Sequence, residues 1–125
     1  MSAVAADLAT LVTSFFTRHL AAERNVSGHT IRSYRDTFRL FLRRVADATG
    51  RQVARLTLQD LTPDAILSFL DYLEQERSNS IPTRNARLAA LHSFFSYVSR
   101  QEASAALLAQ RVLAIPFNSG FRRAL

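Results

Sequence analysis

Residues 25–50 read NVSGHTIRSYRDTFRLFLRRVADATG and carry the clearest helix signal of the sequence. Apolar side chains recur at intervals of three and four residues, which is the spacing of one buried helix face. They are Ile31, Tyr34, Phe38, Phe41, Leu42 and Val45. Ser27 is a suitable N-cap, and Gly50 stands where a helix commonly ends in the left-handed conformation. The stretch therefore predicts a helix from about His29 to Ala48.

Four further helices are predicted by the same apolar spacing. They cover about residues 4–24, 63–77, 81–100 and 102–113. Thr62 and Ser80 are suitable capping residues, and Pro63 takes the first helical position, where no backbone hydrogen bond is lost. Residues 51–61 break the pattern and predict a connector that is anchored by three apolar side chains, Leu56, Leu58 and Leu61.

No segment alternates polar and apolar residues for long enough to predict a strand. We therefore predict an all-α fold, a compact bundle of four helices plus a shorter fifth C-terminal helix. The 125 residues, 48% of them hydrophobic, suffice for one domain with its own core. The absence of cysteine excludes disulfides and thiolate zinc sites. Since no signal peptide or long apolar segment is recognisable, we expect a soluble, cytoplasmic bacterial protein without membrane contact.

The formal net charge is +6, and all sixteen basic residues are arginine. Arginine presents a planar fork that pairs with phosphate, although a genome rich in G and C would also explain the missing lysine. The charge is segregated along the chain. Residues 29–58 carry seven arginines against two aspartates, residues 59–76 carry five acids and no base, and residues 82–100 carry three arginines and no acid. This distribution favours binding of a polyanion by the basic segments, with the acidic segment facing away from it.

His29 and Arg32 form an H-x-x-R spacing, which in some enzymes steadies a phosphate under attack. The other two histidines, His19 and His92, fall on different predicted helices, and none belongs to a zinc-binding motif of the H-E-x-x-H kind. No nucleophile elbow or glycine-rich phosphate loop is present in the sequence. We therefore predict no catalytic residue, no metal site and no cofactor in this chain.

Binding chemistry is better represented, at the starts of the second and fourth helices. Hydroxyl, imidazole and guanidinium groups gather there beside free backbone amides, an arrangement that suits phosphate oxygens. The residues concerned are Ser27, His29, Thr30 and Arg32 on the second helix and Thr83, Arg84, Asn85 and Arg87 on the fourth. In a major groove, arginine can pair with a guanine edge and asparagine with an adenine edge. The two helix starts could together hold one DNA duplex.

Three blocks of sequence occur in an order that resembles a known family. They are FFTRHL with NVSGHTIRSYRDTFRLFL, then LTPDAILSFLDYL, then TRNARLAALHSFFSY. Together they resemble the N-terminal core-binding, SAM-like domain of tyrosine recombinases, the phage integrase family, from about Leu8 to Pro116. The ending LAQRVLAIP is similar to members that transposons and insertion elements encode.

The resemblance implies a domain that grips a recombination half-site with its second and fourth helices and contacts other protomers on the DNA. It also implies a set of DNA-facing residues: His29, Thr30, Arg32, Ser33, Asp36, Thr83, Arg84 and Arg87. Asp36 departs from a basic surface, and we expect it to pair with Arg32 or Arg39. On this reading residues 1–116 form the DNA-binding domain, and residues 117–125 begin a linker.

In the family, the chemistry belongs to a second domain with an arginine pair, a lysine, histidines and a nucleophilic tyrosine. This sequence contains no lysine. We therefore interpret the chain as a non-catalytic fragment of a recombinase used in DNA integration. Two alternatives remain open at this stage: a helical adaptor whose basic face docks an acidic protein, and a helix-turn-helix regulator, which the long second and fourth helices disfavour.

Overall fold

The computed structural model describes residues 7–119, which are helical and contain no strand. The helical elements are α1 (Leu8–Ser14), the π-helix η1 (Phe15–Glu23), α2 (Gly28–Thr49), the short 3₁₀ helices η2 (Val53–Arg55) and η3 (Leu58–Asp60), α3 (Pro63–Gln75), α4 (Ile81–Gln101), the 3₁₀ helix η4 (Ala103–Ala105) and α5 (Ala106–Leu113). The predicted all-α fold of four helices with a shorter fifth is confirmed.

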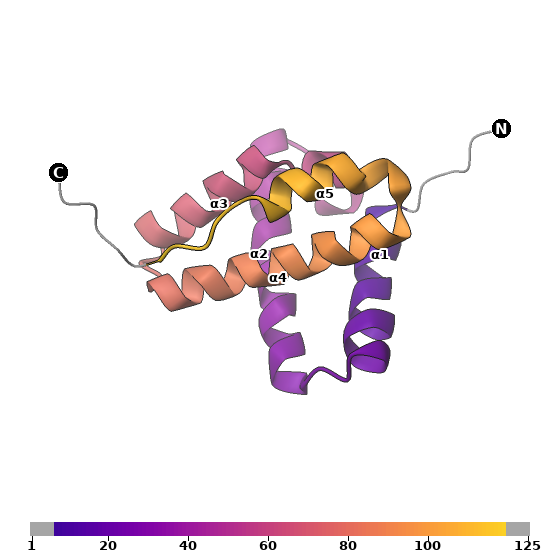
Figure 1. The fold of residues 1–125 in the computed structure, drawn as a ribbon. Coiled ribbons are helices and arrows are strands. Elements are labelled where there is room, and N and C mark those ends of the chain that lie inside the picture. The colour runs from indigo at the N-terminus through magenta and orange to yellow at the C-terminus, as the bar shows by residue number, and fades with distance from the viewer. Residues whose placement is uncertain (1–6, 120–125) are drawn as a thin grey trace.

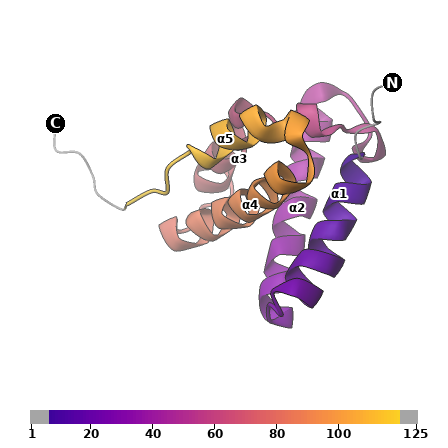
Figure 2. The same cartoon turned by 45° about the vertical axis from the view of Figure 1, so that its right-hand side comes forward.

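Two layers of helices cross in the bundle (Figure 1). α1 with η1 runs beside α2, α4 crosses near the middle of α2, and α3 and α5 lie above α4 in the view of Figure 1 (Figure 2 shows the same arrangement turned). α4 is the central element because it contacts η1, α2, α3 and α5. Phe94 of α4 fills the space where the two layers cross. The centroid of its ring lies 5.4 Å from that of Phe15 and 5.1 Å from that of Phe38. Tyr97 completes this aromatic core and contacts the hydroxyl of Ser14.

α2 follows its prediction closely. Ser27 caps it by accepting a hydrogen bond from Thr30 N, and Gly50 ends it with φ +70°, a conformation that side chains rarely adopt. The predicted buried stripe is confirmed at Phe38, Phe41 and Val45, whereas Ile31, Tyr34 and Leu42 are only half-buried.

The first helix differs from its prediction in start and register. Asp7 is extended and caps α1 through Thr10 N, so the helix starts at Leu8, and residues 4–6 lie outside the described range. From Phe15 onward the backbone follows the i→i+5 pattern of a π-helix, which sequence spacing did not predict. This register places residues five apart on one side, and Phe15 and Leu20 are both fully buried.

The remaining helix boundaries lie close to the predicted ones. Thr62 caps α3 and Ser80 caps α4, as predicted, while α3 ends two residues before Arg77. The connector forms η2 and η3, and its three predicted anchors are buried: Leu56, Leu58 and Leu61. The fifth helix starts as the 3₁₀ turn η4. After α5 the chain continues beside α4 toward the start of that helix, and residues 117 and 118 of the predicted linker contact α4 (Figure 1).

Candidate nucleic-acid interface

The starts of α2 and α4 share one capping arrangement. Ser27 Oγ accepts a hydrogen bond from Thr30 N at 3.2 Å and donates to Thr30 Oγ1 at 3.1 Å. Ser80 and Thr83 repeat this pair at the start of α4, with distances of 3.3 Å and 3.0 Å. Each start therefore presents hydroxyl groups at the positive end of a helix dipole. α4 offers fewer first-turn amides than α2, because Pro82 has no N–H, and Thr83 N already donates to Ser80 Oγ as Thr30 N does to Ser27 Oγ.

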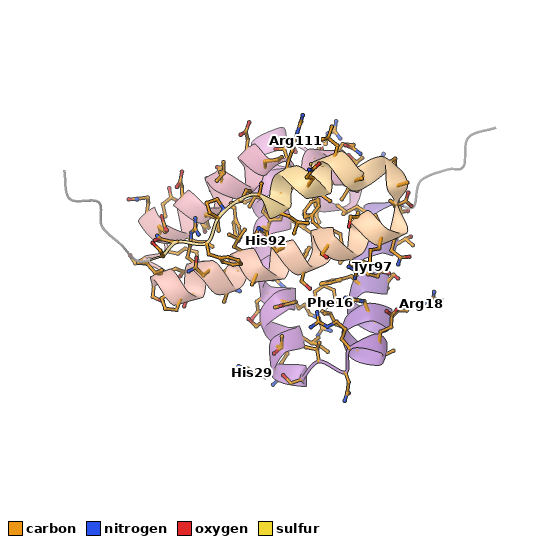
Figure 3. The ribbon with its side chains drawn as sticks, viewed as in Figure 1. Phe16, Arg18, His29, His92, Tyr97 and Arg111 are labelled. Carbon is orange, nitrogen blue, oxygen red and sulfur yellow. The ribbon has the colours of Figure 1, made fainter. Side chains whose placement is uncertain are left out.

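Exposed side chains extend from the start of α2 along its outer side. His29 projects from the lower tip of the bundle (Figure 3). Arg32, Asp36, Arg39 and Arg43 follow at intervals of four, three and four residues, so they share one helix face, and all four are exposed. We call them the outer stripe of α2. Asp36 Oδ1 lies 3.6 Å from Arg39 Nη1, which confirms the predicted pairing.

Arg84 is held inside the fold. Its side chain is only 12% exposed, and its Nε lies 3.3 Å from Glu74 Oε1 on α3. The two groups are close enough for charge attraction, but Arg84 Nε is not aligned for a hydrogen bond. Arg84 Nη1 donates to Asn85 Oδ1 at 3.0 Å. Arg84 therefore supports the start of α4 within the fold rather than projecting into solvent.

Arg87 connects the two candidate helices. Its Nη1 donates to Thr37 Oγ1 at 3.0 Å and lies 3.5 Å from Ser33 O, while its Nε is buried without a partner. Thr37 is only 1% exposed and donates in turn to Ser33 O. Arg87 thus fixes the start of α4 against the first half of α2. Of the sequence-predicted site residues, the exposed ones are His29, Arg32, Ser33, Asp36 and Thr83, while Thr30 is half-buried.

A basic hollow between α2 and α3 was missed in the sequence. It has a volume of about 570 Å³ and is lined by Arg43, Arg44 and Arg77 together with Tyr72 and others. The Arg44 guanidinium carbon lies 4.4 Å from the centroid of the Tyr72 ring, and Arg44 Nη2 donates to Ser68 Oγ. The Arg43-Arg44 pair was the only sequence signal for it, because Arg77 joins from the loop that follows α3.

Three histidines do not converge. His19 is buried beside Glu23, and His29 lies at the tip of α2. His92 Nε2 lies 3.1 Å from Val112 O. In the described part of the chain, no group of three or more histidines, cysteines and acids could hold a metal ion. Nor is any helix of that part long and apolar enough to cross a bilayer.

Burial lowers the pKa of His92 below its ordinary value of 6.5, although hydrogen bonds to Val112 and Ile115 oppose the shift. The unfolded chain therefore takes up a proton at a higher pH than the folded chain does. We expect the contribution of His92 to stability to be present above about pH 6.5 and to fall as the pH drops from there toward the folded pKa. Urea unfolding at about pH 7.5 and 5.5 measures this loss.

His92→Gln is the control, because a glutamine amide can donate to Val112 O and does not titrate. It should lose less stability on acidification than the parent chain. An equal loss in both proteins would show that other groups cause the pH dependence.

Comparisons with known proteins place these observations in a family. Residues 14–102 match the family model described as phage integrase, N-terminal SAM-like domain. A Sinorhizobium fredii protein named integrase/recombinase y4rD is 46% identical over 109 residues, covering 87% of this chain and 39% of the relative. A second, y4rC, is 42% identical over 111 residues, covering 89% and 33%.

A tyrosine recombinase XerC of Roseiflexus is 38% identical over 84 residues, covering 67% of this chain and 25% of the relative. The chain thus spans between a quarter and two fifths of the length of these three relatives. No solved structure matches.

Proposed function

Because this chain belongs to the phage integrase family, as its N-terminal SAM-like domain, we propose that it is the part of a tyrosine recombinase that grips duplex DNA. The starts of α2 and α4 enter the major groove, and the catalytic steps of integration belong to the remainder of the parent protein. The absence of lysine supports this division, since the catalytic site of the family uses one. Other protomers of the same recombinase are the expected protein partners on DNA.

One observation carries the proposal: Arg87 of α4 bonds to Thr37 and so fixes α4 against the first half of α2, and both helices begin with the same Ser-Thr cap. The hydroxyls of both starts and the first-turn amides of α2 suit phosphate oxygens, since helix starts carry partial positive charge. A fixed spacing between two such starts lets both engage one duplex without reorganisation. The acids of α3 lie on a separate helix, where Glu74 is already paired.

Each candidate residue has a role in this arrangement. We assign His29, Thr30, Ser33 and Thr83 to phosphate oxygens, and Arg32 to a phosphate or a guanine edge. Asp36 restrains Arg39 through their ion pair. Arg84 and Arg87 act mainly by holding the start of α4 in place, because their guanidinium groups already bond within the fold.

The length of α2 extends the contact beyond one groove. Its 22 residues span about 33 Å, whereas a major groove is about 12 Å wide. With its start in the groove, the second half of α2 reaches past the groove edge. The basic hollow lies there, and its arginines suit the phosphates of the adjoining backbone.

Titration of a duplex with the whole chain at about 50 and 200 mM salt tests the proposal. Each phosphate that an arginine neutralises releases counterions, so affinity should fall steeply as salt rises. An affinity that does not change with salt, or no binding at low salt, would refute the proposal. Salt-dependent binding of an acidic polypeptide, with no binding of the duplex at low salt, would favour an adaptor instead.

A further inference from the structure

The chain that follows α5 returns to the first turns of α4 and is held there by one side chain. Asn85 Nδ2 donates to Asn118 O at 2.8 Å, and Asn118 N donates to Asn85 Oδ1 at 2.9 Å. A carboxamide carries one donor and one acceptor side by side, so it pairs with both groups of a single peptide residue. Asn85 is the side chain for which the sequence predicts an adenine edge, and the pairing with Asn118 uses the same two groups.

Neighbouring contacts reinforce this pairing. Arg84 Nη1 donates to the Asn85 Oδ1 atom at 3.0 Å and lies 3.5 Å from Pro116 O, so it holds the amide and the returning chain together. Between these contacts, the Phe117 ring stands edge-on to the ring of His92, with centroids 5.1 Å apart. Three consecutive residues of the returning chain, 116–118, therefore contact α4.

We propose that Asn85 anchors a clamp that holds residues 116–118 on the first turns of α4, and that Asn85 keeps this partner instead of a base when DNA binds. The statement that Asn85 keeps Asn118 as its partner on DNA rests on the proposed DNA-binding function. A base could use the Asn85 amide only by displacing Asn118. The clamp thus fixes the direction of the chain where it passes the start of α4.

Amide hydrogen exchange of the whole 125-residue chain, followed by NMR, tests the clamp. The Asn118 amide should exchange slowly in the parent chain, because Asn85 Oδ1 accepts its proton. Asn85→Ala removes both partner groups and should speed that exchange by about tenfold or more. Asn85→Asp keeps an acceptor oxygen beside Arg84, so it should preserve most of the protection.

Ala86→Ser is the matched control, since it changes an exposed residue on the same turn and should leave Asn118 exchange unaltered. Amides in the middle of α4 should stay equally protected in all four proteins, which separates release of the clamp from general unfolding. An Asn118 amide that exchanges equally fast in the parent and in Asn85→Ala would overturn the clamp.

Adding a short duplex decides what Asn85 binds in the complex. We expect Asn118 to stay protected and Asn85→Ala to bind the duplex as tightly as the parent does. Faster Asn118 exchange on DNA binding, together with weaker binding by Asn85→Ala, would show that Asn85 reads a base. That result would overturn the proposal that Asn85 keeps Asn118 as its partner on DNA. Absence of any DNA binding would defeat the proposed function, while the exchange measurement without DNA would still decide the clamp.

Discussion

Replacing Phe94 by alanine should lower the free energy of unfolding by about 3–5 kcal/mol, the range for deletion of a buried aromatic ring. Phe94 is fully buried at the crossing of the two helix layers, edge-on to Phe15 and Phe38. Its removal leaves a cavity that three helices would have to collapse together to fill. Urea unfolding followed by circular dichroism at about 25 °C gives the free-energy difference.

Leu107→Ala is the control, because Leu107 is 59% exposed on α5. It should change the free energy of unfolding by about 0.5 kcal/mol or less. A loss below about 1 kcal/mol for Phe94→Ala would contradict this description of the core, as would a loss no larger than that of the control.

The sequence was informative about the fold wherever the deciding interactions are local. Ser27, Thr62 and Ser80 cap helices through hydrogen bonds to residues three positions ahead, so their roles could be predicted from spacing. The π-register of η1 could not be, because it follows from packing of Phe15 and Leu20 against other helices. Single-chain apolar spacing fits an α-helix there equally well.

The candidate site was predictable only in part, for a similar reason. Charge and helix starts indicated the right elements, but whether an arginine faces solvent depends on partners far away in sequence. Arg84 meets Glu74 on α3, and Arg87 meets Thr37, fifty positions earlier. Nothing beside these arginines in the sequence indicates those contacts.

Replacing the three arginines of the outer stripe of α2, Arg32, Arg39 and Arg43, by glutamine should have the largest effect on DNA binding. Each arginine that neutralises a phosphate contributes about 0.9 to the slope of log affinity against log salt. If all three do so, the slope should flatten by about 2.7, and the difference from the parent should be greatest at low salt. Duplex titrations at four or more salt concentrations measure both quantities.

The matched control replaces three exposed arginines elsewhere, Arg18, Arg55 and Arg111, by glutamine. Arg18 and Arg111 project from η1 and α5, away from the start of α2 (Figure 3). Both triple variants carry the same net charge, so a general attraction between a basic protein and DNA would weaken equally in each. If the duplex lies on α2, the slope of log affinity against log salt should flatten in the stripe variant and stay close to the parent value in the control. Equal slopes in the two variants would contradict the placement of the duplex on α2.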